Sequence, residues 1–226
     1  MDIIGYNWVF SDETLSCIDN FDIRAYLECM LEESCTIGDT ANIRAGCAYR
    51  GAESKLPEGD IPFVGYRNVD IESGINWPDV ARVKVDLKRD PHWLEDGDIL
   101  FASRGMNTYA YPVVNPPPKA TCSPQFFVVT PKRSSNLSSE FLAWQINQAP
   151  AQSYLSRFAD ASTIRNIRRD VLSKMPIFVP SMEQQIIIAN FAKAARRTQQ
   201  IHRALIDNTA LELSALAHQI MNGKTQ

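Results

Sequence analysis

The sequence predicts an α+β protein, in which a globular domain with a mixed, mostly antiparallel sheet precedes a long C-terminal helix that forms a coiled-coil arm. Short runs rich in β-branched and aromatic residues alternate with Gly, Pro, Asn and Asp clusters from residue 35 onward. A helical repeat then runs unbroken from Pro180 to Gly223. The 226 residues, 45% of them hydrophobic, suffice for one core. We therefore divide the chain into a domain at 1–176 and an arm at 177–226.

The first part of the chain is acidic and has a helical pattern. Residues 12–33 place apolar and charged residues at helical spacing, which predicts one or two short helices capped by Asp19 or Asn20. Residues 1–40 carry nine acids and one base, a net charge of −8, whereas the whole chain carries −3. The remainder is therefore mildly basic, at +5, which suits contact with nucleic acid.

Six strands are expected in the sheet, each a short β-branched or aromatic run between turn residues. They cover residues 36–43, 61–66, 80–87, 98–102, 110–114 and 125–130. Helical spacing then returns, with a helix at 138–147 that Ser138 caps, a second at 151–158 and a last turn at 168–174. A strand-like run at 175–179 leads into the arm.

The arm begins with a capping box and ends at a glycine. Ser181 and Gln184 have the spacing of the box, and Gly223 provides the C-terminal stop. At about 1.5 Å per residue the arm measures roughly 60 Å, more than the domain needs to cover its core, although a helix lying on its own domain is the other interpretation. A stripe of mostly apolar residues recurs every three or four positions, as in a coiled-coil seam. The residues that we expect to dimerise are Ile188, Phe191, Ala195, Ile201, Leu205, Leu213, Leu216 and Ile220.

The composition argues against secretion and against a membrane span. No stretch approaches ~18 consecutive apolar residues, and the N-terminus lacks the basic start and apolar run of a signal peptide. The five cysteines are scattered, without a C-x-x-C pair or a nearby histidine, which argues against a disulfide frame and a zinc site. We expect a cytoplasmic protein with no metal site and no membrane partner.

Three segments contain part of a catalytic motif, and each lacks what the chemistry needs. The NPP run at 115–117 is followed by Pro118, where an adenine methyltransferase has an aromatic residue that stacks on the flipped base. Residues 78–88 contain the acid-acid-lysine order of metal-dependent nucleases, but they alternate like a strand with a charged outer face. No phosphate-binding loop motif surrounds Arg104-Gly105. We therefore expect no catalytic residue and no enzymatic activity.

Four segments, in order, resemble the target recognition domain and adjoining conserved helix of type I restriction-modification specificity subunits. They are 36–46 (TIGDTANIRAG), 94–105 (LEDGDILFASRG), 140–147 (EFLAWQIN) and 175–185 (MPIFVPSMEQQ). The resemblance implies a globular recognition domain with a long helical arm, in agreement with the periodicity. Members of that family usually carry two recognition domains and two helices, packed antiparallel as a ruler between two half-sites. This chain holds one of each.

The resemblance thus implies a half-subunit whose missing half is a second copy. A twofold homodimer would pair the two apolar stripes and read a bipartite, palindromic site in double-stranded DNA. The chain itself would be non-catalytic and hold no cofactor. Modification (methyltransferase) subunits would supply S-adenosylmethionine, and restriction or translocase subunits would supply the Mg- and ATP-dependent chemistry. The alternative is a non-catalytic interaction protein, a decoy or exchange partner of a full-length specificity subunit, that does not select DNA by itself.

The resemblance also implies that polar and basic residues on the loops after these segments contact DNA. Arginine can bind guanine O6 and N7, asparagine can bind adenine N6 and N7, and lysine suits phosphates. For any one of them taken alone, a solvated surface residue is the other interpretation. The expected DNA-binding residues are Arg44, Tyr49, Arg50, Lys55, Arg67, Asn68, Arg104, Asn107, Tyr109, Tyr111, Lys119, Thr163, Arg165, Asn166 and Arg168.

Overall fold

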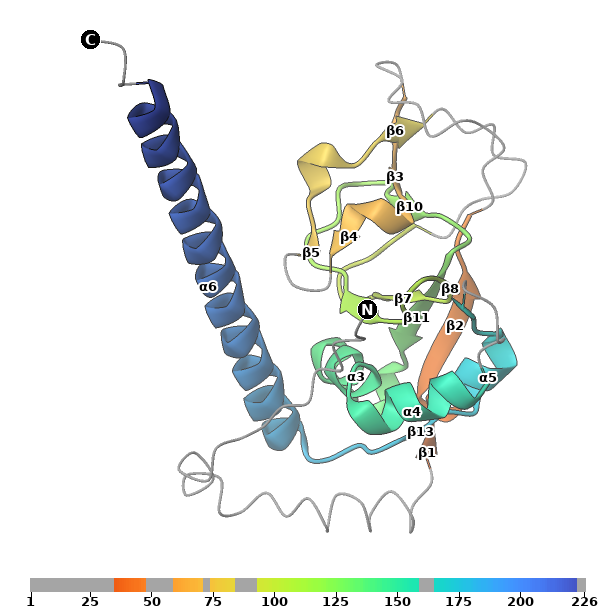
Figure 1. The fold of residues 1–226 in the computed structure, drawn as a ribbon. Coiled ribbons are helices and arrows are strands. Elements are labelled where there is room, and N and C mark those ends of the chain that lie inside the picture. The colour runs from red at the N-terminus through yellow and green to blue at the C-terminus, as the bar shows by residue number, and fades with distance from the viewer. Residues whose placement is uncertain (1–34, 48–58, 71–73, 84–92, 159–164, 223–226) are drawn as a thin grey trace, which may run out of the picture.

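The chain folds as an α+β domain with a long helix standing beside it (Figure 1). The computed structural model describes residues 35–47, 59–70, 74–83, 93–158 and 165–222, so the helices expected at 12–33 lie outside the described residues. The strands are β1 (Cys35–Thr36), β2 (Ala41–Ala45), β3 (Ile61–Val64), β4 (Val69–Asp70), β5 (Gly74–Ile75), β6 (Arg82–Val83), β7 (Ile99–Ala102), β8 (Arg104–Gly105), β9 (Ala110–Pro112), β10 (Thr121–Cys122), β11 (Phe126–Pro131), β12 (Arg165–Asn166) and β13 (Pro176–Ile177). The helices are α2 (Ile37–Thr40), α3 (Ser139–Ile146), α4 (Ala149–Phe158), α5 (Arg169–Ser173) and α6 (Met182–Asn222), with the 3-10 turns η2 (Tyr66–Asn68), η3 (Trp77–Asp79) and η4 (Arg133–Ser135).

The central sheet is four-stranded and antiparallel, in the order β2-β11-β7-β9. A second sheet has the order β10-β3-β6, with β10 parallel and β6 antiparallel to β3. Short antiparallel pairs join β1 to β13, β8 to β12 and β4 to β5. The prediction of a mixed, mostly antiparallel sheet is confirmed.

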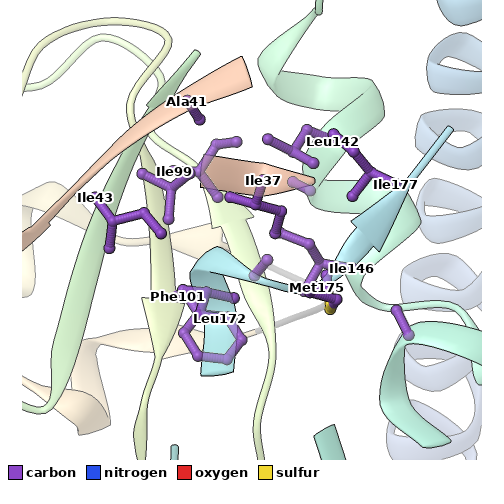
Figure 2. Packing of buried hydrophobic residues seen from close by; sticks show 14 of the residues in the cluster. Ile37, Ala41, Ile43, Ile99, Phe101, Leu142, Ile146, Leu172, Met175 and Ile177 are labelled. Carbon is purple, nitrogen blue, oxygen red and sulfur yellow. The ribbon is translucent and has the colours of Figure 1, made fainter. Parts of the chain in front are cut away.

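The central sheet is buried on both faces, which explains why every residue of β7 is apolar. Ile99 and Phe101 belong to a cluster that the helices α3, α4 and α5 complete, and Figure 2 shows Phe101 beside Leu172 of α5. Leu100 and Ala102 belong to a second cluster, which includes residues of β3, β10 and β11. Successive side chains of a strand point to opposite faces, so a strand between two clusters needs apolar residues throughout.

Cys122 on β10 lies within the second cluster, and burial raises the pKa of its thiol to about 12. The thiolate is the reactive form, so a thiol with a raised pKa reacts slowly at neutral or mildly alkaline pH. We expect a brief iodoacetamide pulse at pH 8 to alkylate the half-buried Cys35 and Cys47 before Cys122, and Cys122 only after denaturant is added. Peptide mapping by mass spectrometry measures this order. Native-state labelling of Cys122 as fast as that of Cys35 would contradict it.

One helical turn interrupts the strand expected at 36–43, because β1 ends at Thr36 and α2 follows. Asp39 accepts hydrogen bonds from the Thr36 hydroxyl at 2.6 Å and the Thr36 backbone N–H at 3.0 Å, and these bonds lower the pKa of the Asp39 carboxyl. The Thr40 hydroxyl donates to the Thr36 carbonyl at 3.1 Å. Local bonds from side chains to the backbone thus outweigh the β propensity of this run, and the prediction of a continuous strand was wrong.

The other expected elements lie where the pattern placed them, several of them shorter. The strand expected at 80–87 is described only as β6, because residues 84–92 lie outside the described residues. The helix α3 begins as predicted, since the Ser138 hydroxyl accepts a hydrogen bond from the Phe141 N–H at 3.3 Å. The pairs β4-β5 and β8-β12 were not anticipated, because two-residue strands have no periodicity to detect.

The helix α6 runs over 41 residues and begins with the predicted capping box. The Ser181 hydroxyl accepts from the Gln184 N–H, and the Ser181 N–H donates to Gln184 Oε1, both at 3.3 Å. Near its start, Gln185 is buried and Ile188 packs against the first cluster. From residue 201 to residue 222 every position is exposed. Among the described helices, none is both long and apolar enough to cross a membrane.

The apolar stripe of α6 is turned away from the domain. At about 100° per residue, the centre of the stripe lies roughly 120° from the side of the helix that carries Gln185. Phe191 is 65% exposed, Leu205 58% and Leu213 62%, whereas Ile188, at the edge of the stripe, is half-buried. The helix therefore does not lie with its apolar face on its own domain.

Candidate nucleic-acid interface

Polar residues gather at one end of the central sheet, just beyond β7. The strand β8 follows β7 after Ser103 and pairs with β12, which places Arg104 opposite Asn166. Arg104 Nε donates a hydrogen bond to Asn166 Oδ1 at 3.1 Å, across 62 positions of sequence. The Ser103 carbonyl accepts a hydrogen bond from the Ile167 N–H at 2.8 Å, which holds β12 at the end of the sheet. Two of the expected DNA-binding residues thus come from distant segments and touch each other.

The turn η2 joins this surface through Tyr66. Its hydroxyl donates to the Asn107 carbonyl at 3.2 Å, and the Asn107 N–H lies 3.3 Å from the hydroxyl oxygen. The Tyr66 ring packs on Gly105, where a Cβ would lie 2.5 Å from the ring Cε2 atom, so a side chain at this position would displace the ring. Arg67 follows and is exposed. We call Tyr66, Arg67, Arg104, Asn107 and Asn166 the polar end surface.

The polar end surface presents groups that can read nucleic-acid bases. The bond to Asn166 uses the Nε of Arg104 and leaves its two Nη groups, the fork that matches guanine O6 and N7. The Asn107 side chain is exposed, and a carboxamide can match adenine N6 and N7. Tyr66 was not singled out from the sequence, because the strand expected at 61–66 included it, whereas β3 ends at Val64.

Arg44, another of the expected DNA-binding residues, lies apart from the polar end surface and forms an ion pair within the domain. Its Nη2 donates to Asp98 Oδ2 at 2.6 Å and to the Trp93 carbonyl at 3.1 Å. The Asp98 side chain is only 1% exposed. The arginine on β2 therefore neutralises a buried carboxylate at the start of β7, and its guanidinium is engaged within the domain.

Tyr109 and Tyr111 also support the domain from within. Tyr109 is 7% exposed, its hydroxyl donates to the Val69 carbonyl at 3.2 Å, and burial raises its pKa. Tyr111 is half-buried against the second cluster, and burial raises its pKa as well. The Tyr109 hydroxyl bonds to β4 and the Tyr111 ring lies against Gly74 of β5, so both rings face the β4-β5 side. Tyr109 supports the Tyr66 ring from within the domain.

The remaining expected residues are distributed around the domain. The Asn68 side chain accepts a hydrogen bond from the Gly65 N–H at 2.9 Å and thereby closes η2. Lys119 precedes β10, and the parallel pairing of β10 with β3 places it at the opposite end from Tyr66. Arg168 is exposed, and its ion pair with Asp170, at 3.6 Å between two exposed groups, contributes little to stability.

The structure describes five of the expected residues only in part or not at all. Tyr49, Arg50, Lys55 and Thr163 lie outside the described residues. For Arg165 the structure describes the backbone, which pairs with Gly105.

The fold is similar to that of a solved specificity subunit. The crystal structure of the type I restriction-modification system S subunit from M. genitalium matches with a TM-score of 0.56 and 16% identity, over 85% of this chain and 46% of that chain. The crystal structure of the HsdS subunit from Thermoanaerobacter tengcongensis has a TM-score of 0.49 and 13% identity, over 83% of this chain and 48% of that one. This chain thus spans about half the length of these structures. At such identities the similarity concerns the fold alone.

The family follows from the sequence match. Residues 32–209 match the model of the type I restriction modification DNA specificity domain. Because the match covers most of the chain, the protein belongs to this family. A comparison with curated proteins gives no match.

Proposed function

We propose that this chain is the sequence-specific DNA-recognition subunit of a type I-like restriction-modification system. Two copies pair through α6, read a bipartite palindromic site in double-stranded DNA, and direct partner modification (methyltransferase) and restriction or translocase subunits to it. In this proposal residues 1–176 form the recognition domain and residues 177–226 the arm that dimerises and spaces the two domains.

The observation that carries the proposal is the apolar stripe of α6 that its own domain leaves uncovered. Leu205, Leu213 and Leu216 are 58%, 62% and 54% exposed. Exposed apolar surface of this extent favours association. A twofold axis satisfies two identical stripes at once, because each covers the other. The chain spans about half of the S subunit structures that it matches, so a pair would supply two recognition domains and two arms.

The proposal assigns no chemistry to the chain itself. Its residues select and hold DNA, whereas S-adenosylmethionine, Mg and ATP belong to the partner subunits. We infer that the protein works in the cytoplasm, together with its partner subunits.

An electrophoretic mobility shift assay tests the proposal. The purified chain, with and without its modification subunit, is titrated against random double-stranded DNA and against the site found by mapping methylation in a genome that carries both. Selective binding to the mapped site supports recognition. Equal affinity for both DNAs, with the modification subunit present, would contradict it.

A second candidate function is favoured by the same stripe. An uncovered α6 can pair with the helix of a full-length specificity subunit as well as with a second copy, which would make the chain a decoy or exchange partner. Mixing the two proteins and measuring mass would reveal a stable heterodimer. In that case the chain would lower site-specific methylation by the full-length subunit instead of adding a new site.

Arg104→Ala tests the polar end surface. We expect this change to weaken binding to the preferred site by about 1–3 kcal/mol and binding to random DNA very little, because a guanidinium that forks onto a base contributes only at the correct sequence. Fluorescence anisotropy with the two DNAs measures both losses. Equal losses on both DNAs would reassign Arg104 to a phosphate contact.

Arg133→Ala is the matched control for Arg104→Ala. Arg133 is also exposed, but it lies at the opposite end of the central sheet from Arg104. It follows the end of β11 that pairs with Ala41, whereas Arg104 lies beyond the end that pairs with Ala102. We expect its loss to leave the discrimination between the two DNAs unchanged.

A further inference from the structure

The arm leaves the domain at a joint built around Gln185. This residue is 0% exposed and is the buried residue of α6. Its Oε1 accepts a hydrogen bond from the Ser138 N–H at 2.8 Å. Its Nε2 donates to the Asn136 carbonyl and to the Pro180 carbonyl, each at 2.9 Å. The carboxamide thus ties the first turn of the arm to the segment that precedes α3.

This joint is anchored in the rigid part of the domain. Ser138 caps α3, and α3 places Phe141 and Leu142, both 0% exposed, in the first cluster. A buried carboxamide with three bonds of 2.8–2.9 Å has one orientation, because any rotation leaves buried polar groups without partners. Ile188, one turn further on, packs against the same cluster. The domain thus holds the start of the helix through two side chains about one turn apart.

Because the arm is long, a small change in its angle at the root moves its far end by a large distance. A helix of 41 residues is about 60 Å long, so a tilt of about 10° moves its far end by roughly 10 Å. The rise of DNA is about 3.4 Å per base pair, so such a displacement corresponds to about three base pairs. The joint is therefore the place where a small change in structure has the largest effect on the separation of two domains held by their arms.

We propose that Gln185 is a positioning residue: it fixes the angle between arm and domain, and in the homodimer it thereby sets the number of base pairs between the two half-sites. This inference rests on the proposed function for its second part, the spacing. Its first part, the angle, concerns the protein alone.

The angle is tested without DNA. Gln185→Met keeps the size of the side chain and removes the three hydrogen bonds, and Gln199→Met, the same change further along α6, is the control. Spin labels attached through ketone-bearing amino acids at Ser156 of α4 and Ala215 of α6 report the distance within one protomer when the labelled protein is diluted with unlabelled protein. We expect a single narrow distance distribution for the unaltered protein and for Gln199→Met, and a broadened or shifted one for Gln185→Met. An unchanged distribution in Gln185→Met would overturn the proposal.

The spacing is tested with a series of DNAs whose half-sites are separated by spacers that grow one base pair at a time. We expect the unaltered protein to bind DNA with one spacer at least about a hundredfold more tightly than DNA with any other spacer. A wrong spacer prevents the second recognition domain from binding, and the gain from two linked contacts is then lost. Gln185→Met should flatten this preference while its affinity for a single half-site stays the same, a split that general destabilisation would not produce. An unaltered spacer preference would overturn the second part of the proposal.

The two tests separate the joint from the proposed function. If no DNA is bound selectively by any variant, the proposed function fails while the distance measurement still decides the role of Gln185. Circular dichroism verifies that each variant is folded. If Gln185→Met does not fold, Gln185→Glu takes its place. This change keeps the acceptor for Ser138 and removes the amide donors to Asn136 and Pro180. A distance distribution identical to that of the unaltered protein would again overturn the proposal.

Discussion

If the chain forms the proposed homodimer, Leu205→Asp combined with Leu213→Asp is expected to leave it monomeric at tens of micromolar protein. Both leucines belong to the uncovered stripe, where they are 58% and 62% exposed. In a pair of α6 helices each leucine would lie against the apolar stripe of the partner helix, and a carboxylate buried there without a partner costs several kcal/mol. With four such carboxylates per dimer the association should be lost entirely. The folded domain should be unaffected, because neither side chain touches it.

The matched control places the same charges on another face of the same helix. Ala204 and Leu211 are exposed and lie roughly 140–160° from the centre of the stripe at about 100° per residue. Ala204→Asp with Leu211→Asp should therefore leave the dimer intact. Light scattering behind a sizing column gives the mass of each variant. A monomeric mass for the unaltered chain would refute self-pairing, and loss of the dimer in the control pair would mean that the helix, not the stripe, had been damaged.

The large elements could be read from the sequence because their signals are local and repeated. The arm carries its apolar repeat over many turns, and its start has a capping box whose two bonds, between Ser181 and Gln184, lie within one turn. The strands β7 and β11 are β-branched and aromatic runs that end at turn residues. The small elements could not be read, since α2 depends on hydrogen bonds between Thr36 and Asp39 that compete with a strand-forming sequence.

The candidate site was predictable only in part, because long-range contacts decide which polar residues reach the surface. Arg104 and Asn166 were both expected to contact DNA, but their pairing across 62 positions is a property of the sheet. Arg44 follows the same local pattern as Arg104, yet a carboxylate 54 positions away turns it into the domain. Gln185 appeared only as the last residue of the family segment 175–185, next to the capping box, and nothing in its neighbours indicates that its partners lie before α3.

Asp98→Ala is expected to destabilise the domain by about 3 kcal/mol. The Asp98 carboxylate is 1% exposed and accepts hydrogen bonds from Arg44 Nη2 at 2.6 Å, from the Glu95 N–H at 3.0 Å and from the Thr130 hydroxyl. Its removal leaves a partly buried guanidinium without its counter-charge. Removing one partner of such an ion pair lowers the free energy of unfolding by more than the intact pair adds to it. The Arg44 side chain is 28% exposed, so the loss should be at the lower end of the usual range.

Urea unfolding measures this loss as a lower midpoint at an unchanged slope. Asp98→Asn keeps an acceptor for the Glu95 N–H and should lose less, about 1–2 kcal/mol. Glu95→Ala is the control, because that exposed residue takes part through its backbone, and its midpoint should stay within about 0.5 kcal/mol of the original. A midpoint for Asp98→Ala equal to that of the unaltered protein would mean that the ion pair does not hold the sheet.

Arg44→Met completes a double-mutant cycle and decides between the two roles considered for this arginine. If Arg44 serves Asp98, the two single changes and the double change will not be additive, because they remove the same interaction. Arg44→Met should then lower stability while the folded fraction binds DNA with unaltered affinity and selectivity. If the variant is instead as stable as the original and loses selective binding, Arg44 reaches the DNA after all, and the polar end surface must extend across β2.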